Sequence, residues 1–237
     1  VALATSTRAA WAEAERGLSP ADLAMHVVLP EVDGRLFAGV ASFKEPGARD
    51  PDLEFSRYVH APAEDRVAAV ADRVAAWVRL GARGAAERPA LVLSTYPGKP
   101  WNMAHAVGLD ALASAEAILA DLGHGAGAPL AQALGAARIA WPLEAYRAAL
   151  AQLPERLRSD LTEAWGAPED DPAVTGGAMR FTALRRGSAL VALQPERGDP
   201  GRRDDEYHDL SRVPRHGYVA FYLWLRQQAD ALIHVGA

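Results

Sequence analysis

Hydrophobic residues follow a helical period between residues 62 and 80. They recur at intervals of three and four residues, and arginine and aspartate occupy positions between them. The apolar members of this pattern are Val67, Val70, Val74, Trp77 and Val78. The spacing predicts an amphipathic helix over 62–80 whose apolar face, including Trp77, packs in the core.

Three shorter runs are almost continuously apolar, at 90–94, 188–193 and 231–235. Runs of this length are typical of strands that are covered on both faces. Segments near 110–122 and 217–227 predict helices that supply this cover together with the helix at 62–80. We therefore expect an α/β fold, in which helices flank a mostly parallel sheet of the Rossmann or flavodoxin-like kind.

The first sixty residues have a different pattern. Ser19 and Pro20 have the order of an N-cap followed by the first helical position. Two short apolar stretches then flank a turn at Glu31–Gly34, and the polar, proline-containing residues 44–57 are typical of a surface loop. These features predict a segment of helix and hairpin that differs from the α/β part of the chain.

We divide the chain accordingly into an N-terminal α+β extension over 1–60 and an α/β segment over 61–237, truncated at its C-terminal end. The chain begins at Val1, and Ala231–Ala237 has the form of a buried strand followed by the start of a loop. In open α/β sheets the functional groups often follow such strand ends. We therefore expect this chain to be part of a longer protein.

Composition excludes several classes of protein. The net charge of −5, from 25 basic and 30 acidic residues, provides no surplus to neutralise phosphates, so nucleic-acid binding is not expected. The absence of cysteine excludes disulfides, thiolate metal sites and cysteine nucleophiles from this chain. No apolar run reaches ~18 residues, and no signal-peptide pattern is present, so we expect a cytoplasmic protein without a membrane span.

Common single-motif enzymes are also excluded. The sequence has no Walker A loop, because Gly98-Lys99 lacks both an upstream glycine and a following serine or threonine. It has no dinucleotide-binding glycine fingerprint, no nucleophile elbow and no His-Glu-x-x-His zinc motif.

A first cluster of polar residues lies between a predicted strand and a predicted helix. It contains Tyr96, Lys99, Asn102 and His105. An ammonium and an amide at the carboxyl end of a strand are suited to an anionic or amide-bearing ligand. The alternative is a Tyr-Pro-Gly turn with a solvated lysine.

A second cluster follows another predicted strand and contains Gln194, Arg197, Tyr207 and His208. His208 beside Asp209 has the composition of an acid–base pair, and the alternative is a solvated polar loop. A third group is the pair His216 and His234, which can donate, accept or ligate a divalent ion such as Co²⁺. Its alternative is a pair of hydrogen-bonded core histidines.

Taken in order, these segments resemble one family, the large subunits of the CobN and magnesium-chelatase type. The Gln194-Pro and Val107-Gly-Leu-Asp110 forms favour the cobalt branch. The segments that carry the resemblance are Gly17–Ala24, Leu29–Arg35, Ser42–Lys44, Leu91–Pro97, Ala106–Asp110, Trp165–Pro168, Gln194–Gly198, Tyr207–Asp209, Pro214–Arg226 and Asp230–Gly236.

The resemblance implies a ligase that forms nitrogen–metal bonds as part of a complex. It implies part of the tetrapyrrole-binding subunit of an ATP-dependent cobaltochelatase, which inserts Co²⁺ into hydrogenobyrinic acid a,c-diamide in aerobic cobalamin biosynthesis. Co²⁺ is then a substrate, and AAA+ partner subunits hydrolyse the ATP. The alternatives are a magnesium-chelatase H-type subunit, or a non-catalytic α/β binding module of the same fold.

The resemblance also suggests roles for the polar residues. His216 and His234 are the candidate catalytic residues, which take protons or pass the metal, and Gly217 permits close approach of a ligand. No metal ligand is assigned beyond these two candidates. The substrate-binding candidates are Tyr96, Lys99, Asn102, His105, Gln194, Arg197, Tyr207 and His208. We expect all of them to converge on one cleft, because parallel strands bring their carboxyl ends to one edge. The family's next motif, with a glutamate that is a metal-site candidate, falls beyond Ala237. We therefore expect this chain alone not to chelate metal.

Overall fold

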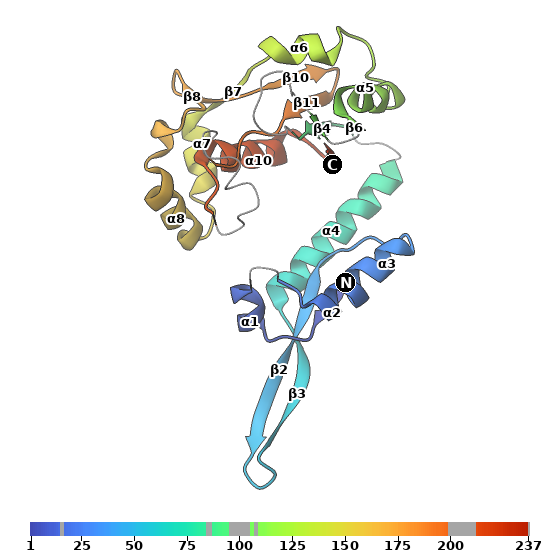
Figure 1. Cartoon of the computed structure of the whole chain (residues 1–237), viewed down its shortest axis with the longest axis vertical. Helices are drawn as coiled ribbons and strands as arrows, with labels where there is room; N and C mark the ends of the chain where they lie inside the picture. Colours follow the sequence, from blue (N-terminus) through green and yellow to red (C-terminus); the bar gives the residue numbers. More distant parts are fainter. Residues whose placement is uncertain (15–16, 84–86, 95–104, 107–108, 199–211, 237) are drawn as a thin grey trace. The chain divides into compact units, whose positions relative to one another are not determined.

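The computed structural model describes residues 1–14, 17–83, 87–94, 105–106, 109–198 and 212–236. Its helices and sheets form a mixed α/β structure (Figure 1). The chain divides into two compact units, Val1–Gly84 and Ala85–Ala237. In the described part of the chain, every helix is too short or too polar to cross a membrane.

The N-terminal unit is built on a sheet of three strands in the order β1-β2-β3, with β1 parallel and β3 antiparallel to β2. The strands are β1 (Ala2–Ala4), β2 (Val40–Asp50) and β3 (Phe55–Pro62). The helices are α1 (Arg8–Glu13), α2 (Pro20–Leu23), the π-helical turn η1 (Ala24–Val28), α3 (Leu29–Val32) and α4 (Glu64–Arg83).

The start of α2 agrees with the sequence pattern. The Ser19 hydroxyl accepts a hydrogen bond from the Asp22 backbone N–H at 3.1 Å, and Pro20 occupies the first turn. Burial of the Asp22 carboxyl opposes its ionisation. Hydrogen bonds from the backbone N–H and hydroxyl of Thr5, both 2.9 Å, outweigh that effect and lower the pKa of Asp22. This carboxylate therefore joins α2 to the end of β1.

The prediction of a surface loop over 44–57 is wrong. These residues form most of a long hairpin, in which Ser42 pairs with Pro62 and Asp50 with Phe55 (Figure 1). A register irregularity between Pro46 and Arg49 accommodates the proline, which has no N–H to donate. Beyond Phe43 none of the strand residues of the hairpin is buried, so this polar part of the sequence lacks the alternation that identifies a half-buried strand.

The helix predicted over 62–80 is present as α4, but its predicted packing is wrong. No residue of α4 is buried, and Trp77 is 52% exposed. The helix packs against β2 in the N-terminal unit, and Val70 lies close to Gly39, the residue before β2. The boundary between the compact units lies at Gly84/Ala85, whereas the sequence division at 60/61 grouped this helix with the second part.

The second unit contains the parallel sheet that the apolar runs predict. Strands β11 and β12 both lie parallel to the central strand β4, and β10 is antiparallel to β11. The order across the sheet is β10-β11-β4-β12. Their bounds are β4 (Pro89–Leu93), β10 (Ala183–Arg186), β11 (Ala189–Leu193) and β12 (Ala231–Val235).

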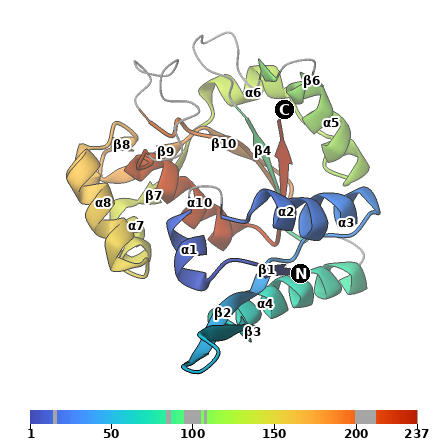
Figure 2. The same ribbon diagram turned by 60° about the horizontal axis from the view of Figure 1, so that its bottom comes forward.

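Helices cover both faces of this sheet (Figure 2). On one face Leu91 and Leu93 pack with α5 (Ala111–Asp121) and α6 (Leu130–Ala136). On the other face Ala90 and Val92 pack with α7 (Leu143–Leu150) and α10 (His216–Gln228). Successive residues of β4 thus enter opposite core layers, which explains why the whole run is apolar.

The remaining elements complete the second unit. A small antiparallel sheet of order β7-β9-β8 carries Trp141, Met179 and Phe181 into the core layer under α10. The bounds are β5 (His105–Ala106), β6 (Leu109–Asp110), β7 (Ile139–Pro142), α8 (Glu155–Trp165), the 3-10 turn η2 (Pro168–Asp170), β8 (Val174–Thr175) and β9 (Ala178–Phe181).

Candidate functional site

Between β4 and β12 the chain connections change the direction in which they move across the sheet. From β4 the chain passes to β11 on one side, and from β11 it returns across β4 to β12 on the other. Open α/β sheets bind ligands in the crevice at such a switch point. The candidate site is therefore the edge formed by the residues that follow these strands.

Ser94 and Gly236 form the base of this edge. The Ser94 backbone N–H donates to the Val235 carbonyl at 3.0 Å, which brings the ends of the two strands together. A Cβ atom at Gly236 would overlap the Ser94 hydroxyl, so only glycine fits there without displacement. Ser94 is not among the residues predicted from the sequence, because one serine at the end of a strand is a common feature.

His234 projects from β12 beside this edge. It pairs in register with Val92, and its side chain is exposed. Its neighbours Ile233 and Val235 pack into the layer of α5 and α6, so strand alternation places His234 on the sheet face that α10 covers. The imidazole therefore has the solvent access that an acid–base or metal-transfer role requires.

His216 lies in a different environment. It is 1% exposed, and both ring nitrogens have partners inside the protein. Nδ1 lies 2.6 Å from the Tyr146 hydroxyl and Nε2 lies 3.2 Å from the Gly166 carbonyl oxygen. A carbonyl oxygen can only accept, so Nε2 carries the proton and the Tyr146 hydroxyl donates to Nδ1. This geometry leaves no nitrogen for a metal or a substrate proton, and it favours a structural role over the catalytic role predicted from the sequence.

Tyr146 is the residue of this pair that sequence patterns did not reveal. It is fully buried on α7, its ring meets the His216 ring edge-on at 5.8 Å, and burial together with the Asp171 charge raises the pKa of its hydroxyl. The two residues are 70 positions apart, so no local pattern connects them.

Asp171 holds the first turn of α10. Its Oδ2 accepts from the Gly217 backbone N–H at 2.9 Å and lies 3.8 Å from the Arg215 guanidinium, which stacks over Trp165 at 5.0 Å. A Cβ at Gly217 would lie 3.0 Å from Asp171 Oδ1. The carboxylate of Asp171 therefore makes the close approach that Gly217 permits.

Gln194 and Arg197 are placed where β11 ends. The Gln194 backbone N–H donates to the Leu93 carbonyl at 2.9 Å, and its amide donates to the Tyr218 hydroxyl at 3.1 Å. The Arg197 guanidinium donates to the Arg212 carbonyl at 3.0 Å. These contacts fasten the start of the loop after β11 to the segment that enters α10.

Five of the predicted binding residues lie outside the described residues, namely Tyr96, Lys99, Asn102, Tyr207 and His208. The backbone of His105 belongs to β5, and its side chain is likewise outside the description. Within the described ranges, no group of three histidine or carboxylate side chains is arranged to hold a metal ion. Convergence of all these residues on one cleft stays a prediction.

Comparison with known proteins gives a consistent result. The family model described as CobN/Magnesium Chelatase matches residues 1–237. The chain is 37% identical to the aerobic cobaltochelatase subunit CobN of Pseudomonas aeruginosa, over 97% of this chain and 20% of that protein. The chain is 35% identical to the protein of the same name from Sinorhizobium, over 98% of this chain and 20% of that protein.

More distant relatives extend the comparison. Identity to the H-type magnesium-chelatase protein of Rhodobacter capsulatus is 26%, over 95% of this chain and 21% of that protein. Among solved structures, the catalytic subunit of cobaltochelatase from Mycobacterium tuberculosis superposes with a TM-score of 0.69 and 31% identity, over 99% of this chain and 22% of that one. The chain spans about a fifth of the length of these relatives. It belongs to the CobN/magnesium chelatase family.

Proposed function

We propose that the chain is a segment of the tetrapyrrole-binding large subunit of a cobaltochelatase, which inserts Co²⁺ into hydrogenobyrinic acid a,c-diamide in aerobic cobalamin biosynthesis. The observation that carries this proposal is the difference in identity between the two branches of the family. Over nearly the same span, identity is 37% and 35% to CobN proteins and 26% to a magnesium-chelatase protein.

Chelation sets three chemical tasks, which are to remove water from Co²⁺, to hold the macrocycle and to remove two pyrrole N–H protons. His234 suits proton acceptance or metal transfer, because its side chain is exposed near the carboxyl ends of β4 and β12. Lys99, Asn102 and Arg197 suit the peripheral carboxylates and amides of a corrin. The further substrate-binding candidates are Tyr96, His105, Gln194, Tyr207 and His208.

ATP hydrolysis belongs, in this proposal, to AAA+ partner subunits in the same cytoplasmic complex. The absence of a Walker A motif from this sequence supports that division of labour. The chain alone is then expected to insert no metal, because neither the ATPase nor the rest of the large subunit is present.

The test uses the full-length large subunit that carries this segment, combined with its partner subunits and ATP. Co²⁺ with hydrogenobyrinic acid a,c-diamide is compared with Mg²⁺ and protoporphyrin, and insertion is followed by the change in visible absorption of the macrocycle. The proposal expects cobalt insertion that disappears when ATP or the partners are omitted. Insertion of magnesium in place of cobalt would assign the chain to the other branch, and insertion of neither metal would support a non-catalytic module.

A further inference from the structure

The two edges of the main sheet differ in chemistry. At one edge, β10 carries Arg185, which is exposed, and Arg186, which pairs with Glu116. At the other edge of the described sheet, β12 has the sequence Ala-Leu-Ile-His-Val, with neither proline nor a permanently charged residue. Natural proteins protect free edges with charges, prolines or bulges, because an unprotected edge pairs with other strands. The β12 edge therefore has the character of an interior strand.

A groove lies next to this edge on the face that α10 covers. Its volume is 290 Å³, and its lining combines the apolar residues Tyr222, Leu225, Ala229, Ala231 and Leu232 with the charged residues Arg226 and Asp230. Leu232 is 52% exposed although it belongs to a strand of the core sheet. Exposed leucine beside an unprotected strand edge indicates a surface that another element covers.

The topology indicates which kind of element fits. The connection from β11 to β12, which both lie parallel to β4, passes through α10, and α10 covers one face of the sheet. Crossovers between parallel strands are right-handed, so two crossovers that move across the sheet in the same direction place their helices on the same face. A further crossover from β12 in that direction would therefore place its helix on the α10 face, beside this groove.

We propose that β12 and this groove are the docking surface for another strand-and-helix segment of the same large subunit. The new strand pairs with the outer edge of β12, which pairs with no further strand among the described residues, and the helix covers Leu232. The choice of the same polypeptide rests on the proposed function as a large-subunit segment and on the comparison with the two CobN relatives, of which this chain covers only 20%. Since His234 lies two residues beyond Leu232 on the same face, the docked helix lies beside the carboxyl ends of β4 and β12.

The test places the photo-cross-linker benzoylphenylalanine at Leu232 in the full-length subunit, and at Arg185 on the opposite edge as the matched control. Isotope-labelled and unlabelled subunits are mixed, so that mass spectrometry separates links within one polypeptide from links between copies. The expected result is a link from position 232 to a peptide of the same polypeptide outside residues 1–237, and none from position 185. Links to residues 1–84, to a second copy or to a partner subunit would overturn the proposal, as would the absence of a link from position 232.

A second measurement does not depend on the cross-linker. Hydrogen exchange of the β12 amides in the full-length subunit is compared between Leu232→Asp and the conservative Leu232→Met. The aspartate variant is expected to exchange about tenfold faster in β12 and in the docked peptide, because local opening sets exchange. Equal protection in the two variants would contradict the docking. Neither experiment contains metal or tetrapyrrole, so failure here is separate from failure of the proposed cobalt insertion.

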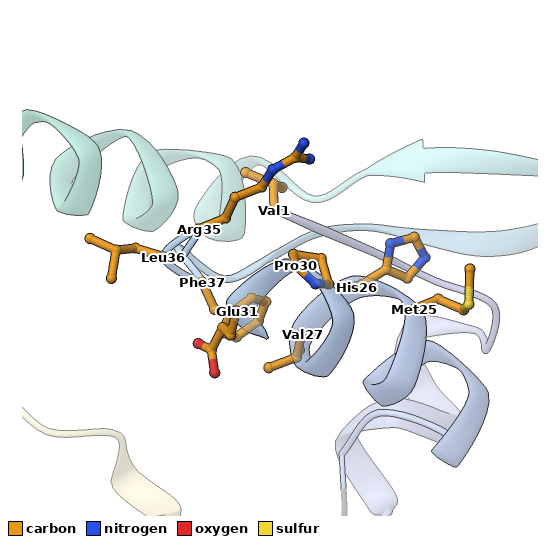
Figure 3. A pocket seen from close by; sticks show the side chains of 9 residues that line it. All are labelled: Val1, Met25, His26, Val27, Pro30, Glu31, Arg35, Leu36 and Phe37. Carbon is orange, nitrogen blue, oxygen red and sulfur yellow. The ribbon is translucent and has the colours of Figure 1, made fainter. Parts of the chain in front are cut away.

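A separate pocket lies in the N-terminal unit, between the helical turn η1 and the segment that leads into β2, and Met25, His26 and Phe37 are among its lining residues (Figure 3). All of its lining residues belong to the unit Val1–Gly84.

Discussion

The Tyr146 hydroxyl and the His216 Nδ1 atom lie 2.6 Å apart and join α7 to the first turn of α10. The second ring nitrogen of His216 extends this connection to Gly166, at the end of α8. The histidine therefore connects three elements through one buried ring, at the point where the chain returns from the loop after β11.

Tyr146→Phe tests this structural role. The variant leaves Nδ1 of His216 without its donor in a buried site, which is expected to lower the free energy of unfolding by about 1–3 kcal/mol. A urea titration measures the change. If His216→Ala stays fully folded yet abolishes cobalt insertion in the full-length enzyme, then the catalytic role predicted from the sequence is correct and the structural role is not.

His234→Ala is expected to lower the rate of cobalt insertion without lowering stability, which is the reverse of a structural role. The side chain is exposed, so the free energy of unfolding should change little, within about 0.5 kcal/mol. Removal of a general base is expected to lower the rate of cobalt insertion by about 100-fold. Steady-state insertion rates and urea titrations of the same preparations check both parts. A variant with an unchanged rate would remove His234 from the proposed site.

Gly236→Ala is expected to destabilise the carboxyl edge of the sheet by about 1–3 kcal/mol, because the new Cβ overlaps the Ser94 hydroxyl. The second substitution Ser94→Gly should restore part of that loss, and a double-mutant cycle of unfolding free energies measures the coupling. Gly135→Ala is the control: Gly135 lies in α6 with open space around it, so alanine should stabilise the chain by about 0.5–1 kcal/mol. Equal changes in unfolding free energy for Gly236→Ala and Gly135→Ala would show that Gly236 does not lie against Ser94 in this way.

Glu116 is expected to contribute a pH-dependent part of the stability. The hydrogen bond from Arg186, at 2.5 Å, lowers the pKa of Glu116; burial opposes this, and the Leu130 backbone N–H, at 2.6 Å, adds to it. Because the folded pKa lies below the ordinary value of 4.5, the stabilisation is complete above that pH and is lost as the pH falls through the folded pKa.

Glu116→Gln should therefore lower the unfolding free energy by about 1 kcal/mol at pH 7 and by less in acid. Urea titrations between pH 3 and pH 7 measure the difference, with Glu163→Gln, at an exposed position on α8, as the control. A loss that is the same at every pH would show that the ion pair with Arg186 is not its cause.

The local pattern of the sequence determined the elements of the second unit. The apolar runs at 90–94, 188–193 and 231–235 are strands of one largely parallel sheet, and the helices near 110–122 and 217–227 cover it. These predictions succeed because a strand that is buried on both faces needs apolar side chains at every position, which a short window of sequence reveals.

Only the tertiary structure decided which side chains are buried and which groups they contact. Trp77 has the spacing of a core residue but is half exposed, and the polar hairpin of β2 and β3 has the composition of a loop. His216 has the chemistry of a catalytic base, yet Tyr146 and Gly166, 70 and 50 positions away in sequence, occupy its two nitrogens. Sequence periodicity records which face of an element is apolar, whereas the partner that meets that face, or that hydrogen-bonds a given side chain, depends on contacts between distant parts of the chain.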